Sequence, residues 1–543
     1  MTDGSDPMAP SGAVNPIDTD YKVGQDNIIV NVGPFGLDIH NRVFAVSGLL
    51  VVAFVVLTLA FQNQVEPMFT AMRGWLTSNL DWFFISAGNV FVLVCLGLAI
   101  SPLGKVRLGG TEATPDYTYL GWFSMLFAAG MGIGLMFFGV SEPLSHFGSA
   151  FGGTAMENGV RTDWAPLGGA AGDADAATRL AMAATIYHWA LHPWAIYAIL
   201  ALGLALFSFN KGLPLTVRSV FYPLLGERVW GWPGHVIDIL AVLATLFGLA
   251  TSLGYGAAQA SSGLNYLFDV PLGNTTQILL VIGITAIALF SVVAGLDAGV
   301  KRLSEINMIL AVLLLLFVIA VGPTLDILSG FFGNLGAYFQ HLPALSNPVG
   351  RDDANFSQGW TAFYWAWWIS WSPFVGMFIA RVSRGRTVRE FIVSVLIVPS
   401  LACVLWMTVF GETAIIQFVR DGYEAATKAE LPLQLFSMLD ALPLAQITSF
   451  IAIILVVVFF VTSSDSGSLV IDVIAAGGKV DAPTPQRVFW CIFEGLVAIA
   501  LILGGGLVAL QAMAVSTGLP FTIVLLMSTV AVIKGLMSEP RVR

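Results

Sequence analysis

Twelve apolar runs, separated by short polar segments, constrain this chain more than any other feature of its sequence. A helix needs about 20 apolar residues to cross a bilayer. Only 11% of the 543 residues are charged, whereas soluble domains carry about 25%. The chain is therefore predicted to be an all-α integral membrane protein with 12 transmembrane helices. The predicted spans are 43–62, 82–101, 120–140, 182–208, 236–260, 277–295, 305–322, 357–380, 391–410, 447–463, 487–504 and 509–533.

The basic residues predict the orientation of these spans. With a cytoplasmic N-terminus, 18 of the 24 Lys and Arg lie on the cytoplasmic side, as the positive-inside rule requires. Both termini are therefore expected in the cytoplasm. The predicted parts are a polar tail of residues 1–42, expected to be mobile, a membrane domain of 43–533, and a short tail of 534–543. The net charge of −10 argues against a nucleic-acid partner. The six remaining Lys and Arg residues lie on the outer side in this orientation. They are Arg73, Arg161, Arg179, Arg351, Arg420 and Lys428.

Tryptophans crowd the eighth predicted span. Its sequence FYWAWWISWSPFVGMFIARVSRGRTVR holds four of them within seven residues, followed by four arginines. Each indole N–H needs a partner inside a membrane, so such a cluster is a costly filler. Indole faces can surround a cation without donatable protons, such as a quaternary ammonium. The cluster therefore indicates an onium site. The four are Trp365, Trp367, Trp368 and Trp371.

A second aromatic set lies in the fourth span, in YHWALHPWAIYAI. Trp189, Trp194 and Tyr197 fall within an arc of roughly 140° at 100° per residue. An interfacial aromatic belt is the alternative, but Trp194 and Tyr197 lie deeper than belt residues do. These two are therefore expected to belong to a site. His188 and His192 are expected to pack, because no metal partner is spaced with them.

Glycines interrupt the third span at Gly130-Met131-Gly132-Ile133-Gly134. A dinucleotide loop is excluded by the absence of a preceding strand, and close helix packing is an alternative. A helix break is favoured, since each glycine costs about 1 kcal/mol in a helix. Breaks at this depth line cavities, where carbonyls bind Na⁺ and helix N-termini face anionic groups. Met131 and Gly132 are therefore expected to contact substrate.

Two other spans carry polar groups. The tenth span ends with Thr462 and Ser463, which are candidate oxygen donors to a hard cation, although hydroxyls often bond back to their own helix. Glu494 is an intramembrane carboxylate and so a site candidate, but no cluster includes it. The sequence shows no catalytic constellation, so neither an enzyme nor a bound cofactor is expected. A channel would lack the broken helix.

Four segments, GMGIGLMFFGVSEPL, YHWALHPWAIYAI, FYWAWWISWSPFVGMFIARVSRGR and FFVTSSDS, resemble the betaine–choline–carnitine transporter family. The resemblance extends over nearly all twelve spans. It implies a LeuT-like inverted repeat, spans 3–7 and 8–12, in a bacterial cytoplasmic (inner) membrane. It also implies a homotrimer embedded in lipid.

The resemblance implies specific site residues. The substrate's onium head would be held by Trp189, Trp194, Tyr197 and Trp368, with Trp367 and Trp371 beside the substrate path. One Na⁺ would bind at Ala128, Met131, Phe459, Thr462 and Ser463. A second Na⁺ would use Thr245 and Phe374, but Leu249 removes one ligating oxygen there, which Thr251 or Ser252 would have to replace.

The resemblance also bears on energy coupling. Proton-coupled choline carriers of the family tend to have Asp where this chain has Gly134, and sodium-independent exchangers supply a fixed positive charge. No Lys or Arg lies within the core spans near Met131 or Thr462. The expected function is Na⁺-coupled uptake of a quaternary ammonium or sulfonium solute, such as glycine betaine or dimethylsulfoniopropionate. The alternatives are an H⁺-coupled choline or carnitine carrier and a carrier of another zwitterion such as ectoine.

Overall fold

A computed structural model describes residues 9–32, 35–294 and 297–541 of the chain. Four parts of the sequence predictions lie outside these ranges: residues 1–8 and 33–34 of the N-terminal tail, residue 295 at the end of the sixth span, and residues 542–543, which include one of the basic residues counted as cytoplasmic.

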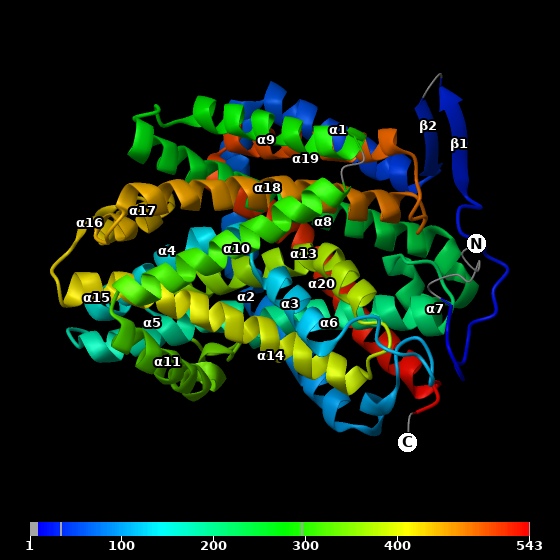
Figure 1. Ribbon diagram of the computed structural model, residues 1–543, viewed down its shortest axis with the longest axis horizontal. Coiled ribbons are helices and arrows are strands. Elements are labelled where there is room, and N and C mark those ends of the chain that lie inside the picture. Colours follow the sequence, from blue (N-terminus) through cyan, green and yellow to red (C-terminus); the bar gives the residue numbers. More distant parts are fainter. Residues whose placement is uncertain (1–8, 33–34, 295–296, 542–543) are drawn as a thin grey trace.

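Helices dominate the described chain (Figure 1). Within the described residues, ten helical segments are long and apolar enough to cross a membrane, and a bent pair, α3 (Tyr119–Gly130) with α4 (Ile133–Gly152), makes an eleventh. The all-α multi-pass class is confirmed, whereas the count of twelve stays a prediction. The ten are α1 (Val43–Ala60), α2 (Gln62–Ile100), α5 with α6 (Ala174–Trp189, Leu191–Ala205), α8 (Trp232–Phe268), α9 (Asn274–Ala294), α10 (Asp297–Val321), α14 with α15 (Val388–Met407, Thr413–Val419), α18 (Ala445–Ala475), α19 (Thr484–Leu503) and α20 (Gly506–Met537).

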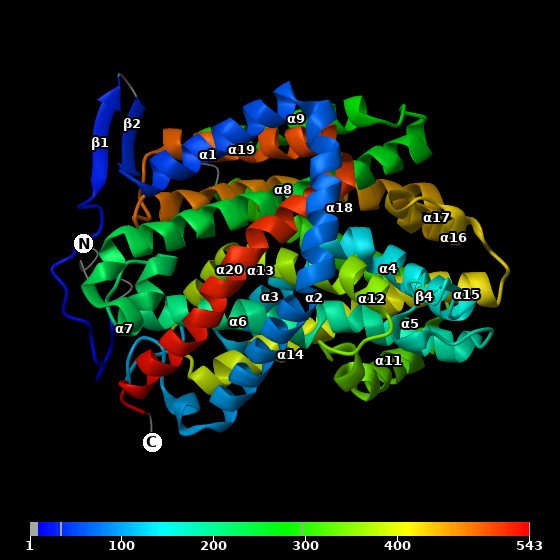
Figure 2. The same ribbon diagram turned by 180° about the vertical axis from the view of Figure 1, so that it is seen from behind.

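The tryptophan-rich eighth span forms α13 (Ala362–Val382). It lies in the centre of the molecule, between α6, α8 and α20 (Figures 1 and 2). Its many tryptophans make it less apolar than the ten helices above, because indole is amphipathic. The other α-helices and the short strands outside these spans comprise α11, which has 22 residues, and elements of two to seven residues. They are α7 (Tyr222–Leu225), α11 (Thr324–Leu345), α12 (Ala354–Phe356), α16 (Ala425–Lys428), α17 (Gln434–Asp440), β3 (Met156–Glu157) and β4 (Val160–Arg161).

The helix contacts agree with the predicted inverted repeat. Helix α8 packs against α9, α19 and α20, while α18 packs against α19, α9 and α10. In the predicted repeat, α8 corresponds to α18, α9 to α19 and α10 to α20, each five spans apart. Replacing each helix by its counterpart turns the contacts of α8 into those of α18. A shift by an odd number of spans also reverses the direction of crossing, so equivalent helices run in opposite directions, as an inverted repeat requires.

The third span is broken at its glycines. Helix α3 (Tyr119–Gly130) ends at Gly130, Met131 and Gly132 are extended, and α4 (Ile133–Gly152) begins at a bend of 62°. The helix thus breaks where the sequence predicted it. Helix α4 continues to Gly152, however, so the outer loop predicted to start after residue 140 starts later.

The described residues of the N-terminal tail lie against the ends of the helices. Tyr21 stacks on Trp230 with ring centroids 4.1 Å apart, and a hairpin follows. Asp38 pairs with Lys479 in the loop between α18 and α19. The beginning and the end of the described chain lie at this side of the molecule, which is called the terminal face here (Figures 1 and 2). The strands of the hairpin are β1 (Asn27–Val32) and β2 (Phe35–His40).

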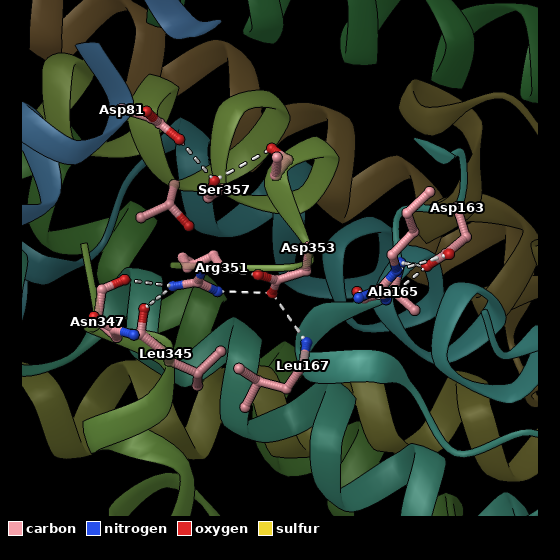
Figure 3. Close-up of polar contacts among 12 residues, drawn as sticks. Asp81, Asp163, Ala165, Leu167, Leu345, Asn347, Arg351, Asp353 and Ser357 are labelled. Carbon is pink, nitrogen blue, oxygen red and sulfur yellow. Dashed lines mark hydrogen bonds and ion pairs between the residues drawn. The ribbon is translucent and has the colours of Figure 1, made fainter. Parts of the chain in front are cut away.

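At the opposite end, the loop between α4 and α5 is tied to the segment before α13 (Figure 3). Arg351 donates to both oxygens of Asp353, at 2.7 and 2.8 Å, and Asp353 accepts the Leu167 N–H at 3.0 Å. Burial would raise the pKa of Asp353, but the bonds from Arg351 hold it below its ordinary value. Arg161 and Asp163 form a second pair within the loop, at 2.8 Å. These bonds hold the loop over the outer helix ends.

Candidate functional site

A cavity lies where the break between α3 and α4 meets the kink between α5 and α6 and the face of α13. The structure brings all eight residues predicted to contact substrate to its wall. Four other residues on different helices also line this cavity. The predicted residues are Met131, Gly132, Trp189, Trp194, Tyr197, Trp367, Trp368 and Trp371, and the further ones are Ile133, Ser252, Val375 and Cys403.

The kink between α5 and α6 positions two of the indoles. Pro193 has no N–H to give to the carbonyl of Trp189, which a continuous helix would have paired. Ala190 leaves the helical region, and the Trp194 indole donates to that carbonyl at 3.2 Å. The proline therefore frees an acceptor, and the acceptor orients the Trp194 ring against the cavity.

Four rings form a box with nearly perpendicular walls. The Trp368 ring meets the Trp189 ring at 72°, with centroids 4.9 Å apart, and the Tyr197 ring at 76° and 6.4 Å. Tyr197 meets Trp194 at 74° and 5.3 Å. Trp367 stacks behind Trp368 at 4.7 Å. Perpendicular rings leave a space lined by π faces, which carry partial negative charge.

The indole N–H groups point away from this space. Trp368 donates to the His188 carbonyl at 2.9 Å, and Trp367 and Trp371 donate to the Gly248 carbonyl at 3.3 and 2.9 Å. Trp189 donates to a carboxylate outside the box, at 2.7 Å. With the Trp194 bond, every tryptophan of the site has its donor satisfied elsewhere. The box presents faces rather than N–H donors to whatever it holds.

Glycines at the helix break allow the rings to approach the backbone. A Cβ added at Gly134 would lie 2.8 Å from Trp189, and one at Gly130 would lie 3.3 Å from Trp194. At Gly132, in contrast, no described atom lies within 4 Å of such a Cβ. Gly130 and Gly134 therefore serve packing against the box, while Gly132 borders open space.

The predicted Na⁺ residues are divided between two cavities. Ala128 and Thr462 line a cavity toward the terminal face, whereas Met131 lines the box. Thr462 also bonds back to the Val458 carbonyl of its own helix, at 3.0 Å. Phe459 is buried and Ser463 half-buried on the same helix, α18. The Na⁺ role of all five stays a prediction.

Two basic residues line the Ala128 cavity as well. Lys301 lies just before the predicted span 305–322, and Arg487 is the first residue of the predicted span 487–504. Both line the same cavity as Thr462, where the sequence predicted no Lys or Arg in the core spans. Arg487 donates to the Asp465 carboxylate at 2.9 Å, which neutralises its charge locally. Helix α18 continues well past the predicted end of the tenth span, so Asp465 is part of the helix and forms this pair there.

The second predicted Na⁺ site has few free oxygens. Thr245 donates to the Ala241 carbonyl at 2.7 Å, and the Leu249 side chain packs against Gly467 of α18. Thr251 donates to the Leu510 carbonyl of α20 at 3.0 Å and so faces away from the box. Phe374 packs edge-on against a site tryptophan, at 5.4 Å.

Glu142, the carboxylate that accepts the Trp189 indole N–H, was not among the predicted site residues. The predicted span 120–140 leaves it in the outer loop, whereas it lies fully buried in α4. His188, expected to pack, bonds to Glu142 at 2.6 Å. His192 does pack, stacked on Trp365 with centroids 5.2 Å apart. The spacing of Glu142 and His146 by four residues within an apolar run is the signal that could have revealed the site.

Glu494, left unassigned, is fully buried in α19. Its Oε2 accepts a long bond of 3.5 Å from Ser464, and its Oε1 has no hydrogen-bond partner among the described residues. Glu494 is a second buried carboxylate, but the described residues that line the box do not include it.

The box lies between two other cavities. The outer one lies under the loop between α4 and α5, where Trp164 rests on Gly359, and Phe138 and Trp360 form part of its wall. Among the described residues, neither this cavity nor the one at Ala128 shares a lining residue with the box.

The chain is similar in sequence to a family of known transporters. The model of the betaine/carnitine/choline family transporters matches residues 42–541. A glycine betaine/proline/choline transporter of Vibrio parahaemolyticus is 75% identical over 98% of this chain and 96% of its own length. A glycine betaine transporter of that organism is 54% identical, over 96% and 97%. A glycine betaine/proline/choline/ectoine transporter, also from V. parahaemolyticus, is 51% identical, over 96% and 91%.

Proposed function

Since this chain belongs to the betaine/carnitine/choline family of transporters, we propose that it imports a quaternary ammonium or sulfonium solute together with Na⁺. Glycine betaine is the leading substrate, because it stands first in the names of three similar transporters. Dimethylsulfoniopropionate has the same combination of an onium head and a carboxylate. Choline and proline, which two of those names include, belong to the same test.

One observation carries the substrate class: the box offers aromatic faces while its indole donors are bonded elsewhere. A trimethylammonium head has no N–H to donate, so it loses nothing in such a site. A cation over a desolvated ring gains about 2 kcal/mol. Three or four rings therefore supply most of the roughly −8 kcal/mol that a micromolar affinity requires. An ammonium with N–H groups would leave its donors unpaired there.

The coupling proposal rests on the helix break. The backbone leaves the helix at Met131, close to Ala128, whose carbonyl accepts from the Met131 N–H, and Thr462 lines the same cavity as Ala128. A bound Na⁺ would fix the shape of the break and hence the wall of the box, which joins ion binding to substrate binding. Gly134 argues against a proton-coupled variant with an acid there, because any side chain at this position meets Trp189.

The transport cycle follows from this placement. We propose that spans 3, 4, 8 and 9 rock against the remaining helices and open the box to one side at a time. The protein would lie in a bacterial inner membrane with the terminal face in the cytoplasm, as the basic residues predict. A homotrimer is the proposed assembly.

Uptake into proteoliposomes tests the proposal. Radiolabelled glycine betaine should accumulate under an inward Na⁺ gradient and should stop when K⁺ replaces Na⁺ at constant pH. Unlabelled dimethylsulfoniopropionate, choline, carnitine, proline and ectoine, added in turn, rank the substrates. Uptake that persists without Na⁺ and follows an imposed pH gradient would establish the H⁺-coupled alternative. Inhibition by ectoine alone would replace the onium assignment with a ring zwitterion.

A further inference from the structure

Glu142 gathers four hydrogen bonds immediately outside the box. Its Oε2 accepts from the Trp189 indole at 2.7 Å and from the Tyr364 hydroxyl at 2.6 Å. Its Oε1 lies 2.6 Å from His188 Nδ1 and 3.1 Å from His146 Nε2. The partners come from α4, α5 and α13, so one carboxylate joins three of the helices that line the substrate site.

The network is complete with an ionised carboxylate and neutral imidazoles. His188 can donate from Nδ1 to Glu142 while its Nε2 accepts from the Thr361 hydroxyl at 2.9 Å. His146 donates from Nε2. Every contact is then satisfied without an extra proton, and one negative charge remains. Among the described residues, no Lys or Arg forms an ion pair with Glu142.

The alternative of a metal centre is less well supported. The ligand atoms of Glu142, His146 and His188 lie within 4.8 Å of one another. Each carboxylate oxygen, however, already accepts two hydrogen bonds, and Trp189 and Tyr364 point N–H and O–H protons at the group. Proton donors directed at the same carboxylate take up the lone pairs that a cation would use. Hydrogen bonding alone explains the arrangement.

We propose that Glu142 is the positioning residue of the onium box and supplies its buried negative charge. The inference rests on the proposed transport of an onium solute and names a further residue that determines affinity for it. The carboxylate fixes the plane of Trp189, the one box ring that it bonds directly. It also bonds the imidazole of His188, the residue whose backbone carbonyl accepts the Trp368 indole N–H at 2.9 Å.

The charge acts on the substrate through the indole. A hydrogen bond from Trp189 to an ionised acceptor is stronger than one to a neutral acceptor. It draws electron density toward the ring and so strengthens attraction of its face for a cation. The carboxylate also attracts the cationic head directly, since charges interact strongly in a low-dielectric interior. Both effects favour an onium head over a neutral group of equal size.

The substitution Glu142→Gln separates charge from shape. The amide oxygen can still accept from Trp189 and Tyr364, and its NH₂ can face the two histidines after a change of tautomer. The box would keep its geometry and lose the negative charge. Glu494→Gln is the matched control, because it neutralises an equally buried carboxylate whose partner is Ser464 on α18.

The test measures glycine betaine uptake into proteoliposomes under an inward Na⁺ gradient, and glycine betaine binding by tryptophan fluorescence, for wild type and both variants. E142Q should raise the KM and the Kd about tenfold with an unchanged maximal rate per reconstituted protein. E494Q should stay within about twofold of wild type in both. Glu142→Asp keeps the negative charge, but its shorter side chain reaches fewer donors. Its KM and Kd should therefore lie between those of wild type and E142Q.

The outcomes separate this inference from the function it rests on. Wild-type protein that takes up no onium solute overturns the proposed function. Wild-type uptake combined with equal KM and Kd values for E142Q and E494Q overturns the role of Glu142 alone. If E142Q does not reconstitute, Trp189→Phe replaces it, because Phe keeps an aromatic face and loses the N–H that binds Glu142. A wild-type KM in that variant would then refute the inference.

Discussion

Replacing Trp368 by Leu removes the ring that touches two other walls of the box. Trp368 is only 7% exposed, so its face is desolvated, and a cation over such a face gains about 2 kcal/mol. At about 1.4 kcal/mol per factor of ten, its loss should raise the KM for glycine betaine about 30-fold. The maximal rate should change little, because the contact holds substrate and transition state alike.

The control is Trp365→Leu on the same helix. Trp365 is fully buried, like Trp368 within a few per cent, but it faces His192 with ring centroids 5.2 Å apart. Both substitutions therefore cost packing in α13, and only one removes a face of the box. Initial rates of Na⁺-driven uptake in proteoliposomes, normalised to reconstituted protein, give both parameters. Equal KM values for the two variants would refute the assignment of Trp368 to the substrate.

Three further substitutions or conditions test other parts of the structure. Gly134→Ala should raise the KM at least about fivefold, since its Cβ would lie 2.8 Å from Trp189, whereas Gly148→Ala on the same helix, with no described atom within 4 Å, should not. Thr462→Ala should raise the Na⁺ concentration for half-maximal uptake several-fold by loss of one oxygen ligand. Thr448→Ala, near the start of α18, should leave that concentration unchanged. Burial lowers the pKa of His40 to about 3, from about 6.5 when unfolded. Docking of the β1–β2 hairpin should therefore be full above pH 6.5 and weaken as pH falls toward 3, by at most about 1.4 kcal/mol per pH unit. Hydrogen exchange of the hairpin that is equal at pH 7.5 and 4.5, after correction for intrinsic rates, would contradict this.

The sequence by itself determined the membrane class, the helix break and the helices that carry the site. Each of these depends on local properties: the length of an apolar run, the cost of glycines in a helix, and the grouping of aromatic residues on two spans. The eight residues predicted to contact substrate meet at one cavity because the aromatic sets already lay on two separate spans, and the break marked where a third approaches them.

Only the tertiary structure decided which polar groups support the box. Glu142 lay just beyond a predicted span, and although its spacing from His146 suits a helix, only the packing of α4 turns this carboxylate toward Trp189 and His188. Thr251 likewise proved to bond to the Leu510 carbonyl of α20. Partners of this kind lie far away in the sequence, and their choice depends on how helices pack. Apolar periodicity and helix-breaking residues indicate where a helix runs, whereas the neighbour that a buried polar group meets is set by the whole fold.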